Sequence, residues 1–218
     1  MIGSHDTFTY LEPCNSIFNS GKRWWKTQCK SIEEQYKFGV RFFDIRVCLD
    51  LDKDMPWRYC WRYCHGIVNF NKYKRTLNDI CLYMDVYFPE AIYRIVLEKG
   101  NSSTIDLFVT ETENLCKHYP NLWRVDIKSS KIWLGAVANN NQELFKRGHK
   151  FALANTWEEP AHELHGSITT SNFYKTNLRK EAQKINGSLE FFKDHQELKN
   201  MIDSKDKLYF LDYCTNEY

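Results

Sequence analysis

The sequence predicts an α/β fold, a small and distorted (β/α)8 barrel of the TIM type, and three observations point to it. Short runs of β-branched and aromatic residues alternate along the chain with segments of helical periodicity. The apolar runs are continuous, as in parallel strands that are covered on both faces. No internal repeat and no linker rich in Pro, Gly or Ser interrupts the 218 residues, so we expect a single domain over 1–218.

Five runs have the length and composition of buried strands, and five segments have helical patterns. Ser31 followed by Glu34 has the spacing of a capping box, and we expect Ser103 to cap the third helix. Because a closed barrel needs eight strands, some of its units must be short or irregular. The expected strands span 40–47, 92–97, 131–137, 150–154 and 207–213, and the expected helices span 31–38, 74–87, 103–119, 178–185 and 189–202.

Composition and charge describe a globular chain without an obvious macromolecular partner. Its 43% hydrophobic content is enough for one sizeable core, and a formal charge of +2 gives no large field to attract nucleic acid. No apolar run is long enough to cross a bilayer, and the first residues lack the features of a signal peptide. We therefore expect a cytoplasmic monomer with no stable nucleic-acid partner, or a secreted protein if a leader has been removed.

Eight cysteines show no paired spacing, and free thiols are the better interpretation in a chain without a leader. Cys60 and Cys64, next to His65, hint at zinc. No second cysteine cluster completes a set of four ligands, so we expect no metal there.

Two aromatic groups suggest surface contacts as an alternative to core packing. Trp24 and Trp25 could anchor the chain at a membrane interface, although we expect at least one of them in the core. Tyr59 and Trp61 belong to a basic aromatic cluster, which also contains Trp57 and suits a lipid surface, a stack of bases or packing around a site.

Four small constellations carry groups suited to catalysis. Each has an ordinary structural explanation by itself, such as a buried ion pair for Asp44 and Arg46, which lie two apart in a strand and face the same side. If the strands are parallel, however, their carboxyl ends meet at one mouth and these groups converge. The first constellation is GSHD at 3–6, which contains His5 and Asp6, and the second is FDIR at 43–46. The third is HG at 65–66, which contains His65, and the fourth is Asp212 at the end of the last strand.

The chemistry that this set favours is the cleavage of a phosphodiester. Arg46 would hold the phosphate oxygens with its planar guanidinium. One histidine would take a proton from an attacking hydroxyl, and the other would give a proton to the leaving oxygen. Nearby acids would fix the tautomers of the two imidazoles, and no metal is required.

Several segments resemble one known family. MIGSHDT is similar to the opening motif of the catalytic X-domain of phosphatidylinositol-specific phospholipases C, and residues 24–47, WWKTQCKSIEEQYKFGVRFFDIRV, resemble that family's most recognisable segment. The CHG at 64–66, FPEAIYRIVLEKG and LYFLDY resemble its second histidine motif, its next strand and its last strand. The match is strong up to about residue 100, weak from 100 to 200, and returns at the final strand.

The resemblance implies a distorted TIM barrel and a role for each matching residue. His5 would be the general base that activates the substrate's own 2-hydroxyl, oriented by Asp212. His65 would be the general acid for the leaving alcohol, with Asp6 beside it. Arg46 would bind the phosphate, with Asp44 next to it, and the product would be a cyclic phosphodiester.

The resemblance also bears on metal use and on the substrate. Calcium-dependent members place a carboxylate where Arg46 stands, so the chain resembles the bacterial metal-independent type and we expect no cofactor. Glu98 falls near a calcium-ligand position, but one carboxylate beside a guanidinium is a poor calcium site. We expect Glu98, Lys99 and Trp157 to contact the substrate.

The leading hypothesis is a metal-independent phosphodiesterase that cleaves an inositol phospholipid during transient contact with a membrane surface. One alternative is the same chemistry on a soluble diester, such as a nucleotide, a cyclic nucleotide or glycerophosphoinositol. The other is a noncatalytic binder of a phosphorylated ligand, which would use the same arginine and histidines.

Overall fold

The computed structural model describes the first two thirds of the chain and one short strand near its C-terminus. The described residues are 1–15, 17–18, 25–28, 30–37, 39–51, 59–70, 75–126, 132–153 and 209–211. The expected helices at 178–185 and 189–202 lie outside them, and the single domain over 1–218 stays a prediction. No helix of the described part is both long and apolar enough to cross a membrane.

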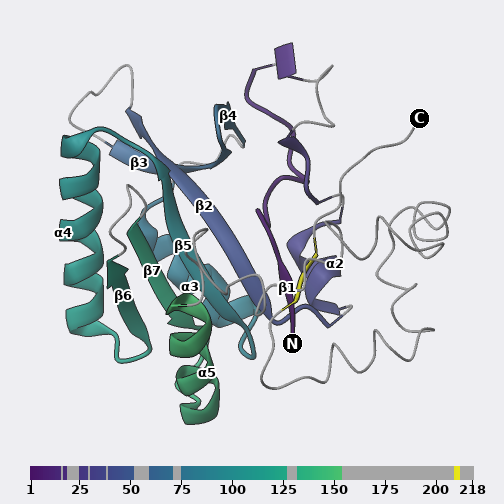
Figure 1. The fold of residues 1–218 in the computed structure, drawn as a ribbon, viewed down its shortest axis with the longest axis vertical. Helices are drawn as coiled ribbons and strands as arrows, with labels where there is room; N and C mark the ends of the chain where they lie inside the picture. Colours follow the sequence, from purple (N-terminus) through teal and green to yellow (C-terminus); the bar gives the residue numbers. More distant parts are fainter. Residues whose placement is uncertain are drawn as a thin grey trace, which may run out of the picture.

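A central sheet organises the described residues (Figure 1). Its main path runs β4-β3-β2-β5-β7-β6, while β1 pairs with β2 and with β8. The strands are β1 (Ile2–Ser4), β2 (Phe42–Leu51), β3 (Tyr59–His65), β4 (Val68–Asn69), β5 (Ile92–Lys99), β6 (Leu122–Asp126), β7 (Ile132–Val137) and β8 (Tyr209–Leu211).

The α/β class is confirmed, with a parallel group of strands at the centre. β8, β1, β2 and β5 are mutually parallel neighbours. The remaining pairings are antiparallel: β3 turns back along the second half of β2, and β7 lies between β5 and β6, antiparallel to both. The described strands form an open sheet rather than a closed barrel, because β6 and β8 pair only with β7 and β1.

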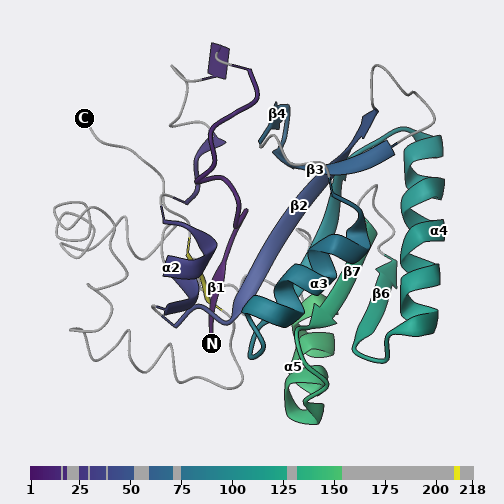
Figure 2. The ribbon, with the colours of Figure 1, turned by 180° about the vertical axis from the view of Figure 1, so that it is seen from behind.

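Helices lie on both faces of the sheet. Figure 1 shows α5 (Gln142–Leu153) on one face, and Figure 2 shows α3 (Leu77–Tyr87) on the other, with α4 (Ser102–His118) along the edge near β6. The short α2 (Ile32–Lys37) precedes β2. The predicted helices at 31–38, 74–87 and 103–119 are therefore confirmed to within three residues.

Side-chain caps explain where these helices begin. The capping box is present: the Ser31 amide donates to Glu34 at 2.9 Å, and the Glu34 amide donates to the Ser31 hydroxyl at 3.3 Å. The expected Ser103 cap is wrong, because Asn101 accepts from the Thr104 amide at 2.9 Å and caps α4. An asparagine oxygen satisfies the same free amide, so the helix begins one residue before Ser103.

Two strand predictions need correction. Residues 150–153 form the end of α5, so the strand expected at 150–154 is wrong. Short apolar runs fit a buried strand and a buried helix equally well, and here the run extends a helix that begins at Gln142. The strand expected at 131–137 exists as β7, but it is antiparallel to β5, whereas we expected it to be parallel.

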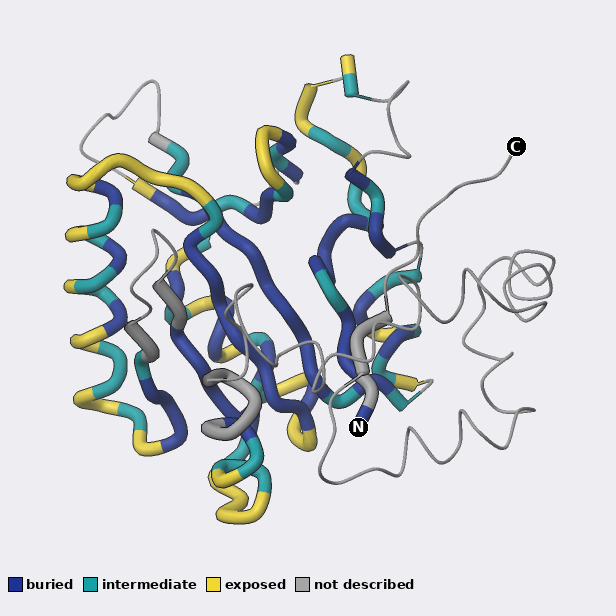
Figure 3. The backbone as a smooth tube through the Cα atoms, in the orientation of Figure 1, coloured by how far each residue is buried: buried dark blue, intermediate teal, exposed yellow. Residues whose placement is uncertain are grey.

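The main core lies on one face of β2 and β5, and the alternation of side chains along β2 produces it. Phe43, Ile45 and Val47 pack into a cluster with residues of α3 and α4. Their neighbours at 42, 44 and 46 face the other way, toward the side that α5 covers. Figure 3 shows that the central strands are buried while the outer sides of the helices are exposed.

The described aromatic residues of the sequence clusters lie mostly in the core. Trp25 is buried, and its indole N–H donates to the Phe18 carbonyl at 3.0 Å, so packing rather than membrane contact explains it. Trp61 is also buried in the main core, whereas Tyr59 is 38% exposed. Trp24 and Trp57 lie outside the described residues.

Candidate active site

Six of the predicted site residues meet around one guanidinium group. β1 leads directly into the histidine and acid of the GSHD motif, the middle of β2 carries the FDIR pair, and the ends of β3 and β5 supply the others. The parallel pairing of β1 with β2, and of β2 with β5, places these segments side by side. The six residues are His5, Asp6, Asp44, Arg46, His65 and Glu98.

Arg46 is the centre of the cluster. Its Nε lies 2.6 Å from Asp6 Oδ1 and 3.2 Å from Asp44 Oδ2. Its Nη1 donates to Glu98 Oε2 at 2.8 Å, and its Nη2 donates to His5 Nε2 at 2.7 Å. The side chain is only 6% exposed, so the guanidinium is held by neighbours on every edge.

The alternation of β2 and its pairing with β5 explain this electrostatic arrangement. Asp44 and Arg46 lie two apart on one face, and Arg94 stands opposite Asp44 in the register of β5. Arg94 Nε donates to Asp44 Oδ1 at 2.6 Å. Burial would raise the pKa of Asp44, but the two guanidinium groups outweigh burial and hold this pKa well below its ordinary range.

The same neighbours keep Arg46 charged. Burial lowers the pKa of this guanidinium, but the carboxylates of Asp6, Asp44 and Glu98 raise it more, so the pKa lies above its ordinary value. A buried cation with three carboxylates around it is a fixed positive charge at any pH at which the protein is folded.

A strained turn positions the first histidine. Asp6 has a φ of 47°, in the left-handed region that aspartate tolerates better than most residues. The His5 carbonyl accepts from Thr27 Oγ1 at 3.1 Å and from Gln28 Nε2 at 2.9 Å. The Thr7 amide donates to a β2 carbonyl at 2.8 Å, so the turn is tied both to the 25–28 segment and to the sheet.

The two imidazoles flank one carboxylate oxygen. His5 Nε2 lies 3.5 Å from Asp6 Oδ2, and His65 Nε2 lies 3.4 Å from the same oxygen. His65 Nδ1 lies 2.7 Å from the Trp25 carbonyl, which can only accept, so Nδ1 carries a proton. His5 Nε2 accepts from Arg46, which can only donate, so the lone pair of this nitrogen faces the guanidinium.

His65 reaches the cluster by a route that differs from our expectation. We expected every group to come from the carboxyl end of a parallel strand, but β3 is antiparallel to β2. The hairpin pairs Tyr63 with Val47, so the end of β3 lies beside the middle of β2, where Arg46 stands.

The other predicted site residues are placed elsewhere or lie outside the described part. Lys99 directly follows Glu98, but its Nζ donates to Asn69 Oδ1 at 3.3 Å and it lines a separate cavity. Trp157 and Asp212 lie outside the described residues. Their proposed roles stay predictions.

The donor atoms of the cluster do not fit a calcium ion. His5, Asp6 and Asp44 each offer one ligand atom within 4.8 Å of the others. The Arg46 guanidinium contacts all three groups, so it takes the place of a cation among them. Calcium also requires six to eight oxygen ligands, and a buried guanidinium would repel it.

Reasoning from the sequence missed three residues that build the site. Arg94 is a charged residue within the apolar run at 92–97, and this break in the pattern was a usable signal. Thr27 and Gln28 hold the turn through side-chain hydrogen bonds, and the sequence shows them only as two neighbouring polar residues within the segment at 24–47. Their contacts span more than 20 positions, which no local pattern encodes.

The chain is similar in sequence to proteins of known name. The chain is 29% identical over 210 residues to the 1-phosphatidylinositol phosphodiesterase of Staphylococcus aureus strain Newman, and the alignment covers 93% of this chain. The PI-PLC X domain-containing protein 1 of Danio rerio is 26% identical over 110 residues, which cover 41% of this chain and 35% of the fish protein.

The similarity has definite limits in length and in structure. The chain spans 60% of the length of the staphylococcal relative. The structure of the phosphatidylinositol-specific phospholipase C from Listeria monocytogenes aligns with a TM-score of 0.47 and 15% identity, over 98% of this chain and 87% of that one. No protein-family model matches the chain.

Proposed function

We propose that this chain is a metal-independent phosphodiesterase of the phospholipase C type, with an inositol phospholipid as its substrate. One observation carries the proposal: the two imidazole Nε2 atoms approach the same Asp6 oxygen beside the Arg46 guanidinium. The two nitrogens are therefore no more than about 7 Å apart. At this spacing one nitrogen can serve the attacking oxygen of a phosphodiester and the other its leaving oxygen.

His5 is suited to the role of general base. Its Nε2 lone pair points at Arg46 Nη2, where a phosphate oxygen would bind. When the phosphate takes that N–H donor, the lone pair becomes available to the substrate's own 2-hydroxyl. The hydroxyl oxygen attacks phosphorus, its proton moves to His5 Nε2, and a cyclic phosphodiester forms.

His65 is suited to the role of general acid. The Trp25 carbonyl fixes a proton on Nδ1, so the second proton of the cationic form sits on Nε2, which faces Asp6. The Nε2 proton then passes to the leaving alcohol.

Two further observations support the assignment of residues and substrate. The register of β1 and β8 pairs Ser4 with Leu211, and these residues directly precede His5 and Asp212. This register supports Asp212 as the group that orients His5. The staphylococcal relative is a 1-phosphatidylinositol phosphodiesterase, which supports an inositol lipid as the substrate.

The test compares histidine variants on vesicles that contain phosphatidylinositol, with ³¹P NMR detection of a cyclic inositol phosphodiester. His5→Asn and His65→Asn should each lower turnover by about 10²–10⁴-fold. His118→Asn is the control, because this exposed histidine on α4 lies outside the cluster. Near-normal turnover in either site variant would refute the role assigned to that residue.

Soluble substrates separate the alternatives. Glycerophosphoinositol and a panel of nucleotides and cyclic nucleotides are offered to the same proteins. Turnover of a soluble diester without turnover of the vesicles would replace the lipid as substrate but keep the chemistry. Tight binding without turnover of any of them would show a binding protein and overturn the enzymatic proposal.

A further inference from the structure

Arg94 is a buried cation beside the cluster that takes no part in the mechanism proposed above. Its side chain is 2% exposed, and it stands on β5 opposite Asp44 of β2. Its Nε donates to Asp44 Oδ1 at 2.6 Å, which is short even for a hydrogen bond between a guanidinium and a carboxylate. Arg94 therefore fixes one of the two oxygens of this carboxylate.

The other Asp44 oxygen contacts the site. Arg46 approaches Oδ2 with two donors, Nε at 3.2 Å and Nη2 at 3.3 Å. Pairs of a guanidinium and a carboxylate are frequently bidentate, with two short and parallel hydrogen bonds to the two oxygens. In this structure both donors share one oxygen at longer distances, because Arg94 occupies the second oxygen. Asp44 therefore holds Arg46 loosely, and Nη2 has its shorter contact, of 2.7 Å, with His5 Nε2.

Apolar packing keeps the Arg94 guanidinium in place. Ile92 and Val96 are its neighbours on the same face of β5, and with Phe42 they belong to a second buried cluster on the side of the sheet that α5 covers. The guanidinium carbon lies 5.4 Å from the centre of the Phe42 ring, within the range of a cation–π contact. A side chain enclosed in this way has few other conformations, so its hold on Asp44 Oδ1 is rigid.

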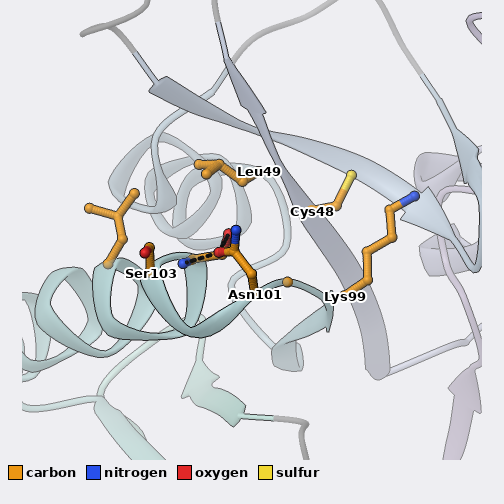
Figure 4. A pocket seen from close by; sticks show the side chains of 8 residues that line it. Cys48, Leu49, Lys99, Asn101 and Ser103 are labelled. Atoms are coloured by element: carbon orange, nitrogen blue, oxygen red, sulfur yellow. Dashed lines mark hydrogen bonds between the residues drawn. The ribbon is translucent and has the colours of Figure 1, made fainter.

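Lys99, the other cation of β5, has a different environment. Its Nζ donates to Asn69 Oδ1 at 3.3 Å, and it lines a cavity of about 500 Å³ together with Cys48 and the first turn of α4. Figure 4 shows that the side chains of Cys48 and Lys99 extend in the same direction from their strands. Of the two β5 cations, Arg94 is therefore the one in contact with Asp44.

On the basis of the phosphate-binding role given above to Arg46, we propose that Arg94 is a positioning residue of the phosphate site. By occupying Asp44 Oδ1, it prevents this carboxylate from pairing with Arg46 through both oxygens. Nη2 therefore stays directed at His5 and at the place of the phosphate. Without Arg94, the Asp44 carboxylate would turn and accept from Nε and Nη2 with one oxygen each. The phosphate would then compete with Asp44 for Nη2, and its affinity would fall.

The test compares two uncharged replacements of Arg94 by calorimetry of inorganic phosphate binding to the full chain. Glutamine carries an amide nitrogen at the position of the arginine Nε, so Arg94→Gln keeps the donor to Asp44 Oδ1 and loses only the charge. Arg94→Met loses both. Arg94→Met should bind phosphate about three to ten times more weakly than wild type, whereas Arg94→Gln should stay within about twofold.

A second substitution tests whether Arg94 acts through Asp44. In the Asp44→Asn background the carboxamide has one acceptor oxygen and cannot form the two-oxygen pair. Adding Arg94→Met to Asp44→Asn should therefore change phosphate affinity by less than about twofold, because the effects of coupled residues are not additive. Arg124→Met is the control for the substitution, because its contact with Glu113 is partly exposed and lies outside the cluster. It should bind phosphate as wild type does.

Three results would overturn the proposal. Equal weakening in Arg94→Gln and Arg94→Met would show that only the charge of Arg94 matters, and unchanged binding in Arg94→Met would show that the residue has no role at the site. If Arg94→Met does not fold, a loss of more than about tenfold in Arg94→Gln decides against the proposal in the same way. The third result is that the wild-type chain binds no inorganic phosphate.

The enzymatic function is judged separately, by turnover of the vesicles. A chain that cleaves no phosphodiester but shows the expected difference between Arg94→Met and Arg94→Gln would disprove the enzyme and keep the positioning role. A chain that cleaves phosphatidylinositol but binds phosphate equally well in wild type and Arg94→Met would keep the enzyme and remove the role of Arg94.

Discussion

Replacing Arg46 by methionine tests how strongly the charge cluster is held together. Methionine keeps most of the length of the side chain but removes its charge and its donors. The change takes away the contacts of the guanidinium with Asp6 at 2.6 Å and Glu98 at 2.8 Å, and with Asp44 at 3.2 Å. All three carboxylates are at most 10% exposed, so water replaces little of what is lost.

The magnitude follows from the contacts that each carboxylate loses. Asp44 retains Arg94 at 2.6 Å, whereas Asp6 loses a 2.6 Å contact and Glu98 a 2.8 Å contact with the guanidinium. Leaving a buried charge without its partner costs about 3–5 kcal/mol, and a carboxylate that takes up a proton instead limits this cost. We expect the free energy of unfolding at pH 7 to fall by about 3–5 kcal/mol.

The pH dependence has a definite sign. The pKa of Asp44 is held below its ordinary value of 3.8, chiefly because Arg94 and Arg46 outweigh burial. Such a group stabilises the folded state above pH 3.8 and loses this contribution as the pH falls through its lowered pKa. Without Arg46 the contribution is smaller, so the difference between wild type and variant should be largest near neutral pH and shrink below pH 4.

Urea unfolding at several pH values measures both effects. Arg124→Met is the control, because the Arg124–Glu113 pair also has a 2.8 Å contact but is 22% and 49% exposed. Such a pair should contribute no more than about 1 kcal/mol. If Arg46→Met costs no more than Arg124→Met at pH 7, or if its cost does not change with pH, the argument for a tightly coupled buried cluster is wrong.

Four further predictions follow from other contacts. The Glu98 carboxylate competes with phosphate for the Arg46 guanidinium, so Glu98→Gln should bind inorganic phosphate about three to ten times more tightly in calorimetry. Weaker binding by this variant would contradict the role of Glu98 as a competitor. Removal of metal ions with EDTA should leave phosphodiesterase turnover unchanged because Arg46 supplies the positive charge, and a loss that Ca²⁺ restores would disprove this. Burial raises the pKa of half-buried Asp85 to about 6, so its ionisation opposes folding as the pH rises from 3.8 through 6. Solvent screening reduces the effect, so Asp85→Asn should raise the free energy of unfolding in urea by about 1 kcal/mol at pH 7.5 and hardly at all at pH 4. Equal effects at the two pH values would contradict this pH dependence. Glu111 Oε2 accepts a hydrogen bond from the buried Trp61 indole at 2.6 Å. Glu111→Ala should therefore lower the free energy of unfolding by about 1–3 kcal/mol, and Glu111→Gln should lower it by less. Equal losses in the two variants would refute the hydrogen-bond explanation.

Local signals were sufficient where a structure depends on neighbours in the chain. The capping box at Ser31 and Glu34 lies where its spacing predicts, because both hydrogen bonds form within one helical turn. The pair Asp44 and Arg46 shares a face because side chains alternate along any strand. The ends of α3 and α4 were also predicted to within three residues, because helix ends depend on nearby residues. The cap of α4 is Asn101 rather than Ser103.

Local signals failed where two structures fit the same composition. The run at 150–154 is apolar enough for a strand, but residues 150–153 continue a helix that packs on β7. The predicted direction of β7 was wrong because the residue pattern of a strand is the same in parallel and antiparallel pairing. The register shows the direction: β7 runs antiparallel to both β5 and β6.

The sequence by itself determined which groups this protein can use: two histidines, an arginine, its carboxylates and the strands that carry them. Only the tertiary structure decided that Arg46 contacts Glu98, 52 positions away, and that His65 arrives on an antiparallel strand. The physical reason is that side-chain alternation and helix caps depend on near neighbours. Contacts between strands depend on register and direction, which are set by packing of the whole sheet.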